Sequence, residues 1–130
     1  MNPSSQNYMP VINSYQGCEQ AKIYTDRNKT AISLSDIIIL EGVSNYTFVH
    51  FVNGKKILIS KTLKEFSDTF LANNFARIHK SYFINMNYVM SYQTKGLYFV
   101  TMKTGQKVEI SRRRKQYFER QVAEFIRKRN

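Results

Sequence analysis

Phe75-Ala-Arg-Ile-His-Lys-Ser-Tyr-Phe-Ile-Asn85 is the stretch of this 130-residue chain that decides how the rest is interpreted. Its apolar positions suit a buried strand, but four of its side chains are polar: Arg77, His79, Lys80 and Ser81. A strand that only built a core would not need so much hydrogen-bonding chemistry. We therefore expect this segment to form part of the framework and to carry a functional site.

The segments around it predict short strands. Strands are expected at 21–25 and 30–34 (a hairpin around 26–29), 36–41 (a central strand), 46–52, 55–60, 76–84, 89–92, 97–102 and 107–111. Asn53-Gly54 joins two of them, and this dipeptide can adopt positive φ at both turn positions. Both faces of 46–52 carry apolar groups, which is typical of a strand covered on both sides.

Two helices are predicted. Thr62-Leu-Lys-Glu65 is a capping box, followed by apolar residues at helical spacing, so a helix is expected over about 63–71. A helical period returns over 112–129, with an apolar stripe of Phe118, Val122, Phe125 and Ile126 and basic residues on the other faces. The fold class is therefore mainly β, with one short internal helix and one C-terminal helix.

Composition limits the class of partner. Twenty Lys plus Arg against nine Asp plus Glu give a net charge of +11, which favours a polyanion, nucleic acid first and an anionic membrane surface second. A merely basic soluble protein is the plainer alternative. Cys18 is the only cysteine, so no internal disulfide can form. No signal peptide or bilayer-length apolar run is present, so a cytoplasmic domain is expected.

Catalysis has no support in the sequence. His50 and His79 fall in no metal-binding pattern, and the carboxylates are few and scattered. No phosphate-cradling glycine loop and no nucleophile elbow occurs. We expect no enzymatic activity, no metal and no cofactor.

Three polar clusters suit nucleic-acid recognition. Ser44-Asn45-Tyr46 is a loop that could read a base edge or contact a phosphate, although Ser and Asn also favour plain turns. In His79-Lys80-Ser81, Lys80 could donate to guanine or phosphate, and His79 could instead be structural, holding a loop. Ser111-Arg-Arg-Arg-Lys115 offers planar guanidinium groups to guanine or phosphate.

The start of the internal helix adds a fourth candidate. Lys61, Thr62 and Lys64 flank it, and helix N-termini expose amides that attract phosphates. Capping alone is the plainer role for Thr62.

The 75–85 stretch, together with Leu40-Glu41 through Asn45-Tyr46 and with Ile110-Ser-Arg-Arg-Arg114, resembles the LytTR family over about 21–124. Members are bacterial β-rich DNA-binding domains, usually the output half of response regulators. The resemblance implies small antiparallel sheets packed in an elongated body, without a recognition helix. It also implies that loops and strand ends read bases in two successive major grooves.

By this resemblance the base-reading residues are Asn45 or Tyr46, Lys80, and Arg112. It assigns phosphate contacts to Thr62, Lys64, Ser81 and Lys115; position in the sequence adds Lys61, His79, Arg113 and Arg114. Lys80 stands where some members have an amide, which suggests a different base preference. The length of the first loop leaves Asn45 and Tyr46 as alternatives.

Domain organisation and partners follow. Residues 1–19 are expected to be a flexible N-terminal tail and 20–130 the domain. The tail is too short for a receiver domain, so the chain is either a stand-alone regulator or the output part of a longer one, served by an upstream signalling protein. Family analogy implies two copies on direct repeats of bent double-stranded DNA, with a homodimer on the DNA as one arrangement.

Two rival functions remain at this point. An RNA-binding β domain could stack bases on some of the nine Tyr and nine Phe. A protein-interaction module could dock its basic terminal helix on an acidic partner or a membrane.

Overall fold

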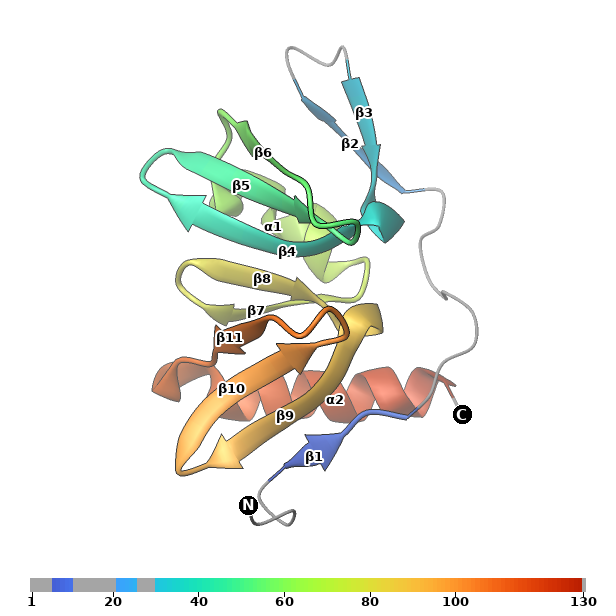
Figure 1. Cartoon of the computed structure of the whole chain (residues 1–130), viewed down its shortest axis with the longest axis vertical. Helices are drawn as coiled ribbons and strands as arrows, with labels where there is room; N and C mark the ends of the chain where they lie inside the picture. Colours follow the sequence, from blue (N-terminus) through green and yellow to red (C-terminus); the bar gives the residue numbers. More distant parts are fainter. Residues whose placement is uncertain (1–5, 11–20, 26–29, 130) are drawn as a thin grey trace.

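The computed structural model describes residues 6–10, 21–25 and 30–129, and within these ranges the chain is mainly β, as the sequence predicts (Figure 1). The strands are β1 (Asn7–Tyr8), β2 (Lys22–Thr25), β3 (Thr30–Ser33), β4 (Ile37–Val43), β5 (Tyr46–Phe51), β6 (Lys56–Ile59), β7 (Phe75–His79), β8 (Tyr82–Asn85), β9 (Val89–Lys95), β10 (Leu97–Met102) and β11 (Lys107–Glu109). The helices are α1 (Leu63–Leu71) and α2 (Lys115–Arg129), with 3-10 turns η2 (Leu34–Asp36), η3 (Met86–Tyr88) and η4 (Arg112–Arg114).

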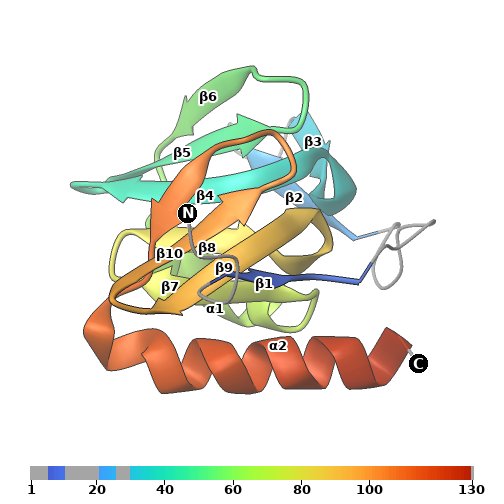
Figure 2. The same ribbon diagram turned by 60° about the horizontal axis from the view of Figure 1, so that its bottom comes forward.

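The strands of the described ranges form antiparallel sheets that are stacked along the molecule. A five-stranded sheet has the order β6-β5-β4-β8-β7, a four-stranded sheet has the order β1-β9-β10-β11, and β2 pairs with β3. Helix α2 runs alongside β7 and the four-stranded sheet, as the two views show (Figures 1 and 2). The prediction of a central strand at 36–41 is confirmed, because β4 lies in the middle of the larger sheet.

Two hydrophobic cores lie on opposite faces of the five-stranded sheet. The α1 core packs Phe66 and Phe70 of the helix against Phe75 and Phe83 of the hairpin β7–β8. The α2 core packs the stripe of the terminal helix against the other face and the four-stranded sheet; its members include Ala76, Ile78, Ile84, Val100, Phe118, Val122 and Phe125. Hairpin β7–β8 therefore contributes to both cores.

The predicted single strand over 76–84 is wrong, because the structure divides it into β7 and β8. Arg77 pairs with Phe83 and His79 with Tyr82, with an irregularity in register between them, and Lys80–Ser81 forms the turn. The apolar period continues across this turn, so the alternation of side chains gave no sign of it. The expected alternation of Lys80 and Ser81 along one strand is wrong for the same reason.

The β5–β6 hairpin has a three-residue turn. At Asn53-Gly54 only the glycine has positive φ, at 91°, so the expectation that both residues could adopt it is not met. The Gly54 amide donates to the Phe51 carbonyl at 3.0 Å, and the Asn53 side-chain oxygen accepts from the Lys55 amide at 2.9 Å. This pattern is a type I turn followed by a left-handed glycine.

The N-terminal segment is ordered where the structure describes it. Asn7 and Tyr8 pair with Tyr92 and Ser91 as strand β1, and the Met9 amide donates to the Met90 carbonyl at 2.9 Å. The structure thus places a short strand within the predicted tail, and the division into a tail over 1–19 and a domain over 20–130 stays a prediction. Residues 1–5 and 11–19 of the predicted tail lie outside the described residues.

The helix predictions hold more closely. Helix α1 has the predicted bounds, and Thr62 and Glu65 form both bonds of the capping box. The predicted C-terminal helix begins as the turn η4 and continues as α2. Strand β5 is less covered than expected: Val49 is fully buried, but Tyr46 on the other face is 47% exposed. Neither described helix is long and apolar enough to cross a membrane.

Asn85 provides a test of this architecture. Its side chain is fully buried, donates to the Ile37 carbonyl at 2.8 Å and accepts from the Asn87 amide at 3.0 Å. Asn85→Leu removes both bonds and leaves buried polar groups unpaired, so we expect a loss of about 2–4 kcal/mol in the free energy of unfolding. Urea denaturation measures this.

Asn53→Ala at the exposed turn is the matched control, because it also removes one side-chain bond to an amide. Its expected loss is below about 1 kcal/mol, since water replaces that bond. Equal losses in the two variants would contradict a special role for Asn85.

Candidate nucleic-acid interface

The turn between β7 and β8 is held by side chains of its own hairpin. A guanidinium nitrogen of Arg77 donates to the Lys80 carbonyl. On the other side of the turn, the Nδ1 atom of His79 accepts from the Ser81 amide at 3.1 Å. These two bonds fix the turn backbone, and the Lys80 side chain is left exposed.

The β4–β5 turn lies directly beside it. The Gly42 amide donates to the Ser81 carbonyl at 2.8 Å, which ties the end of β4 to the β7–β8 turn. A Cβ atom at position 42 would lie 3.0 Å from Cδ1 of Leu63, so the absence of a side chain lets the start of α1 approach. Ser44 has φ of 56°, and the two-residue turn places Tyr46 at the start of β5.

The connection from β11 to α2 lies on the other side of the same turn. The Ser111 amide donates to the Ile78 carbonyl at 2.8 Å, and the Arg114 amide donates to the Ser111 carbonyl at 3.0 Å. These bonds hold the start of η4 against β7. Three segments distant in sequence are therefore joined around Lys80 by backbone hydrogen bonds, along the left edge of the molecule in Figure 1.

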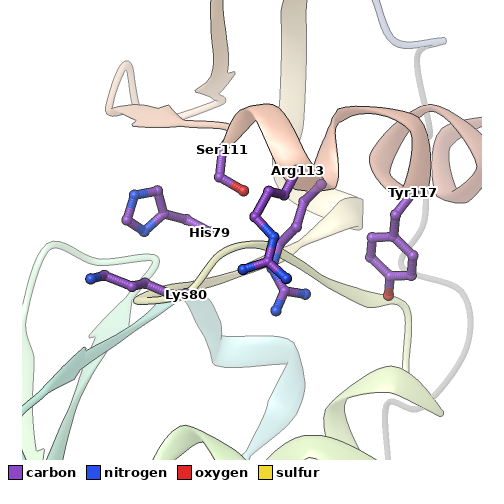
Figure 3. Close-up of a pocket in the computed structure, with 6 residues that line it drawn as sticks. His79, Lys80, Ser111, Arg113 and Tyr117 are labelled. Atoms are coloured by element: carbon purple, nitrogen blue, oxygen red, sulfur yellow. The ribbon is translucent and has the colours of Figure 1, made fainter.

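Two hollows lie on this edge, and Lys80 lines both. The first, which we call the arginine hollow, is lined by His79, Lys80, Ser111, Arg113, Arg114 and Tyr117 (Figure 3). The second, the helix hollow, is lined by Gly42, Ser44, Tyr46, Thr62, Leu63, Lys64, Arg77, Lys80 and Ser81. In Figure 3, His79 and Lys80 lie on one side of Arg113, and Tyr117 lies on the other.

The charge of these hollows is of one sign. Their lining includes the cationic side chains Lys64, Arg77, Lys80, Arg113 and Arg114, and none of their lining residues is Asp or Glu. Burial raises the pKa of Tyr117, and the nearby positive charge of Arg114 opposes that rise, so the phenol stays neutral and able to donate near pH 7. The surface can therefore bind an extended polyanion through charge-assisted bonds.

Most of the predicted site residues line these hollows. Those brought together are Tyr46, Thr62, Lys64, His79, Lys80, Ser81, Arg113 and Arg114. Asn45 is exposed but lines neither hollow, so of the two alternatives in the first loop it is Tyr46 that lies in a hollow with Lys80. Thr62 uses its hydroxyl in the capping box, accepting from the Glu65 amide at 3.3 Å.

Besides Asn45, three predicted residues lie outside the two hollows. Arg112 lines a separate hollow beside Leu97, Phe99 and Lys107, so it does not lie with Lys80. The Lys115 ammonium lies 5.1 Å from the ring centre of Tyr98. The Lys61 ammonium donates to the Tyr24 carbonyl at 3.3 Å. The sequence predicts one patch over 111–115, but successive side chains of a tight helical turn project in different directions.

His79 has a structural role that sequence reasoning kept as its alternative. Its Nδ1 atom is taken by the Ser81 amide, and its Nε2 atom lies 3.7 Å from a Glu109 carboxylate oxygen. Its ring also lies 5.5 Å from that of Tyr82, centre to centre. We conclude that the imidazole organises the turn.

Arg77 was not among the predicted site residues. It lines the helix hollow, holds the Lys80 carbonyl, and lies with its guanidinium carbon 5.6 Å from the ring centre of Phe83. Burial first, and the charge of Arg114 second, lower the pKa of Arg77, although the group remains a cation. The available signal was an arginine within an otherwise apolar strand.

The exposed surface of α2 is different in character. It carries Glu119 and Glu124 as well as Arg120, Arg127 and Lys128. Arg127 forms an ion pair with Glu124 and lowers the pKa of that carboxyl. This surface is of mixed charge, so it is a weaker candidate for a polyanion than the two hollows are.

A β domain that joins three loops around a basic surface has the features of the class of nucleic-acid-binding domains. The sequence matches the LytTr DNA-binding domain family over residues 27–123, which is most of the chain. The chain therefore belongs to the LytTr DNA-binding domain family, and the resemblance found in the sequence is confirmed.

Two known proteins are similar to it. The sensory transduction protein LytT of Bacillus anthracis is 25% identical over 116 residues, covering 78% of this chain and 45% of that protein. The chain thus spans less than half the length of this relative. A solved LytTr DNA-binding domain from Bacillus cereus has 21% identity and a TM-score of 0.65, covering 78% of this chain and 94% of that one, which supports the fold.

The histidine of the turn can be tested directly. His79→Phe keeps an aromatic ring near Tyr82 but removes the acceptor for the Ser81 amide. A hydrogen bond is worth about 1 kcal/mol, so exchange of the Ser81 amide with solvent should be roughly fivefold faster. Amide hydrogen exchange followed by NMR measures this.

Exchange of the Val49 amide, in the centre of β5, serves as the internal control and should be unchanged. If both amides exchange faster by the same factor, the variant has lost global stability and the local role of His79 is contradicted.

Proposed function

We propose that this chain is a sequence-specific double-stranded DNA-binding transcription regulator that reads bases in the major groove through its loops and strand ends. The observation that carries the proposal is the joining of three loops around Lys80 on a surface whose hollows are lined by five cationic side chains and by no acidic one. Such a surface follows a phosphate backbone, and its protruding side chains reach the grooves.

Phosphate binding is assigned first to the cations of the hollows. Lys64, Arg113 and Arg114 offer charged donors on either side of Lys80. The N-terminus of α1 adds its partial positive charge behind Thr62. Ser81 contributes a hydroxyl in the helix hollow, whereas Lys61 and Lys115 would have to leave their present contacts to join.

Base reading is assigned to exposed side chains at the loops. Tyr46 serves the first loop in preference to Asn45, and Lys80 serves the central turn, where an ammonium can donate to guanine O6 and N7. Arg112 remains the expected reader of the third loop. Arg113 is its rival, because it shares the arginine hollow with Lys80 and Arg112 does not.

The biological setting is proposed from the family. LytT of Bacillus anthracis is more than twice as long as the region it shares with this chain, and it is described as a sensory transduction protein. We place this domain in a bacterial cytoplasm, under an upstream signalling protein or a receiver domain of the same regulator. Two copies, as a homodimer on DNA, would occupy direct repeats.

The structure supports DNA over the two rivals. The exposed surface of α2 has mixed charge, which weakens docking of that helix on an acidic partner. Of the phenylalanines, Phe66, Phe70, Phe75, Phe83, Phe118 and Phe125 are core members, so they offer no stacking platform for single-stranded RNA.

Selection of random duplexes on the purified chain tests the proposal. With excess nonspecific competitor, a short motif should be enriched, in direct repeats about one helical turn apart. If four phosphates are neutralised, affinity for the motif should fall roughly 150-fold between 50 and 200 mM salt. Absence of any motif, or tighter binding to single-stranded RNA, would overturn the proposal.

Individual variants test the assigned readers. Lys80→Met should cost about 1–3 kcal/mol on the selected motif and relax selectivity at one base pair, because it removes a base-directed donor. Arg112→Ala and Arg113→Ala are compared in the same assay. The variant that removes the base-reading residue of the third loop should lose selectivity at a second base pair.

Lys103→Met is the matched control for net charge, because Lys103 is exposed on the β10–β11 connection, outside both hollows. It should leave selectivity unchanged. A uniform loss across all duplexes in Lys80→Met would show that Lys80 contacts phosphate alone.

A further inference from the structure

We propose that Arg77 is the positioning residue for base recognition by Lys80: it sets the conformation of the Lys80–Ser81 turn and so determines where the Lys80 ammonium enters the groove. This inference rests on the proposed function and deepens it. No contact between Arg77 and a base is required, because the arginine acts through the backbone of the turn.

The contacts of Arg77 place it under the turn. Its guanidinium donates to the carbonyl of Lys80, three residues further along the hairpin. Its guanidinium carbon lies 5.6 Å from the ring centre of Phe83, the residue paired with Arg77 across the ladder. Phe83 is fully buried in the α1 core, so the arginine is supported by a fixed surface.

The surroundings of Arg77 are unusual for a structural arginine. Among the residues that the structure describes, no carboxylate lies within ion-pair distance of it. Its Nε atom is buried without a hydrogen-bond partner, and Arg114 is a nearby like charge. Arg77 is partly buried, and holding its charge beside a like charge without a counter-charge lowers stability, so stability alone does not account for an arginine here.

The position of Arg77 in the helix hollow gives a functional reason for this loss of stability. Arg77 and Lys80 both line the helix hollow, so a DNA phosphate bound there would supply the missing negative charge. Bound DNA would then keep the Arg77 guanidinium in place, so its hydrogen bond to the Lys80 carbonyl would be kept while Lys80 contacts a base. A planar guanidinium can stack on a ring and donate in its own plane, which an ammonium cannot do.

A double-mutant cycle tests this inference. Wild type, Arg77→Met, Lys80→Met and the double variant are measured on the selected duplex and on one changed at the base pair read by Lys80. The preference is the ratio of the two affinities. Lys80→Met should lower it roughly 5- to 150-fold, the equivalent of 1–3 kcal/mol. Arg77→Met should lower it to a similar extent, and the double variant should lose no more than Lys80→Met alone.

Additive losses, where the two factors multiply in the double variant, would overturn the inference, because they would show that Arg77 acts independently of Lys80. An unchanged preference in Arg77→Met, with both duplexes bound more weakly by the same factor, would also overturn it. If wild type shows no preference for any duplex, the proposed function itself fails, so the two failures are distinct.

Arg77→Lys keeps the inference testable if Arg77→Met folds poorly. It retains the charge, so affinity for the changed duplex should stay within about twofold of wild type, while the preference falls. Circular dichroism and thermal unfolding establish that each variant is folded. Lys64→Met is the matched control, because the Lys64 side chain lines the same hollow from α1. In the double variant with Lys80→Met, the two losses of affinity for the selected duplex should multiply.

Discussion

The rest of the structure depends on a turn whose backbone is closed by side chains. Arg77 and His79 satisfy the carbonyl of Lys80 and the amide of Ser81, so β7 can reverse into β8 at that point. Phe75 and Phe83 of this hairpin belong to the α1 core, and Ala76 and Ile84 belong to the α2 core. The same element therefore joins both halves of the molecule and carries the side chain at the centre of the interface.

The arrangement of charge distinguishes function from stability in this domain. On α2, Arg127 and Glu124 neutralise each other in the usual manner of an exposed helix. In the two hollows beside the β7–β8 turn the lining cations have no acidic lining residue among them, and their mutual repulsion is tolerated because the two cores and the backbone bonds fix the loops. A site of this kind is ready for a polyanion before the polyanion arrives, and less ordering is needed on binding.

Local signals in the sequence were sufficient where one residue type dictates one geometry. The capping box at Thr62 fixed the start of α1, and the run at Ile37 marked a central strand. The split of 76–84 was missed, because apolar spacing continued through a turn closed by long-range side-chain bonds. Strand β1 could not be predicted, because its two polar residues form a strand only by pairing with the edge of β9. Arg112 and Arg113 line different hollows because they lie on a 3-10 turn, which composition does not encode.

Strand β1 also covers an edge of its sheet. A strand at the edge of a sheet offers unpaired backbone groups to any other extended chain, which is a common origin of aggregation. Here Asn7 and Tyr8 pair with that edge of β9, and the side-chain amide of Gln6 donates a hydrogen bond to the Ser91 hydroxyl at 3.1 Å. The N-terminal segment of the chain therefore pairs with the backbone groups of β9 at this edge. A fragment limited to residues 27–123, the range of the family match, would lack β1 and would leave the edge of β9 open to pairing with other molecules.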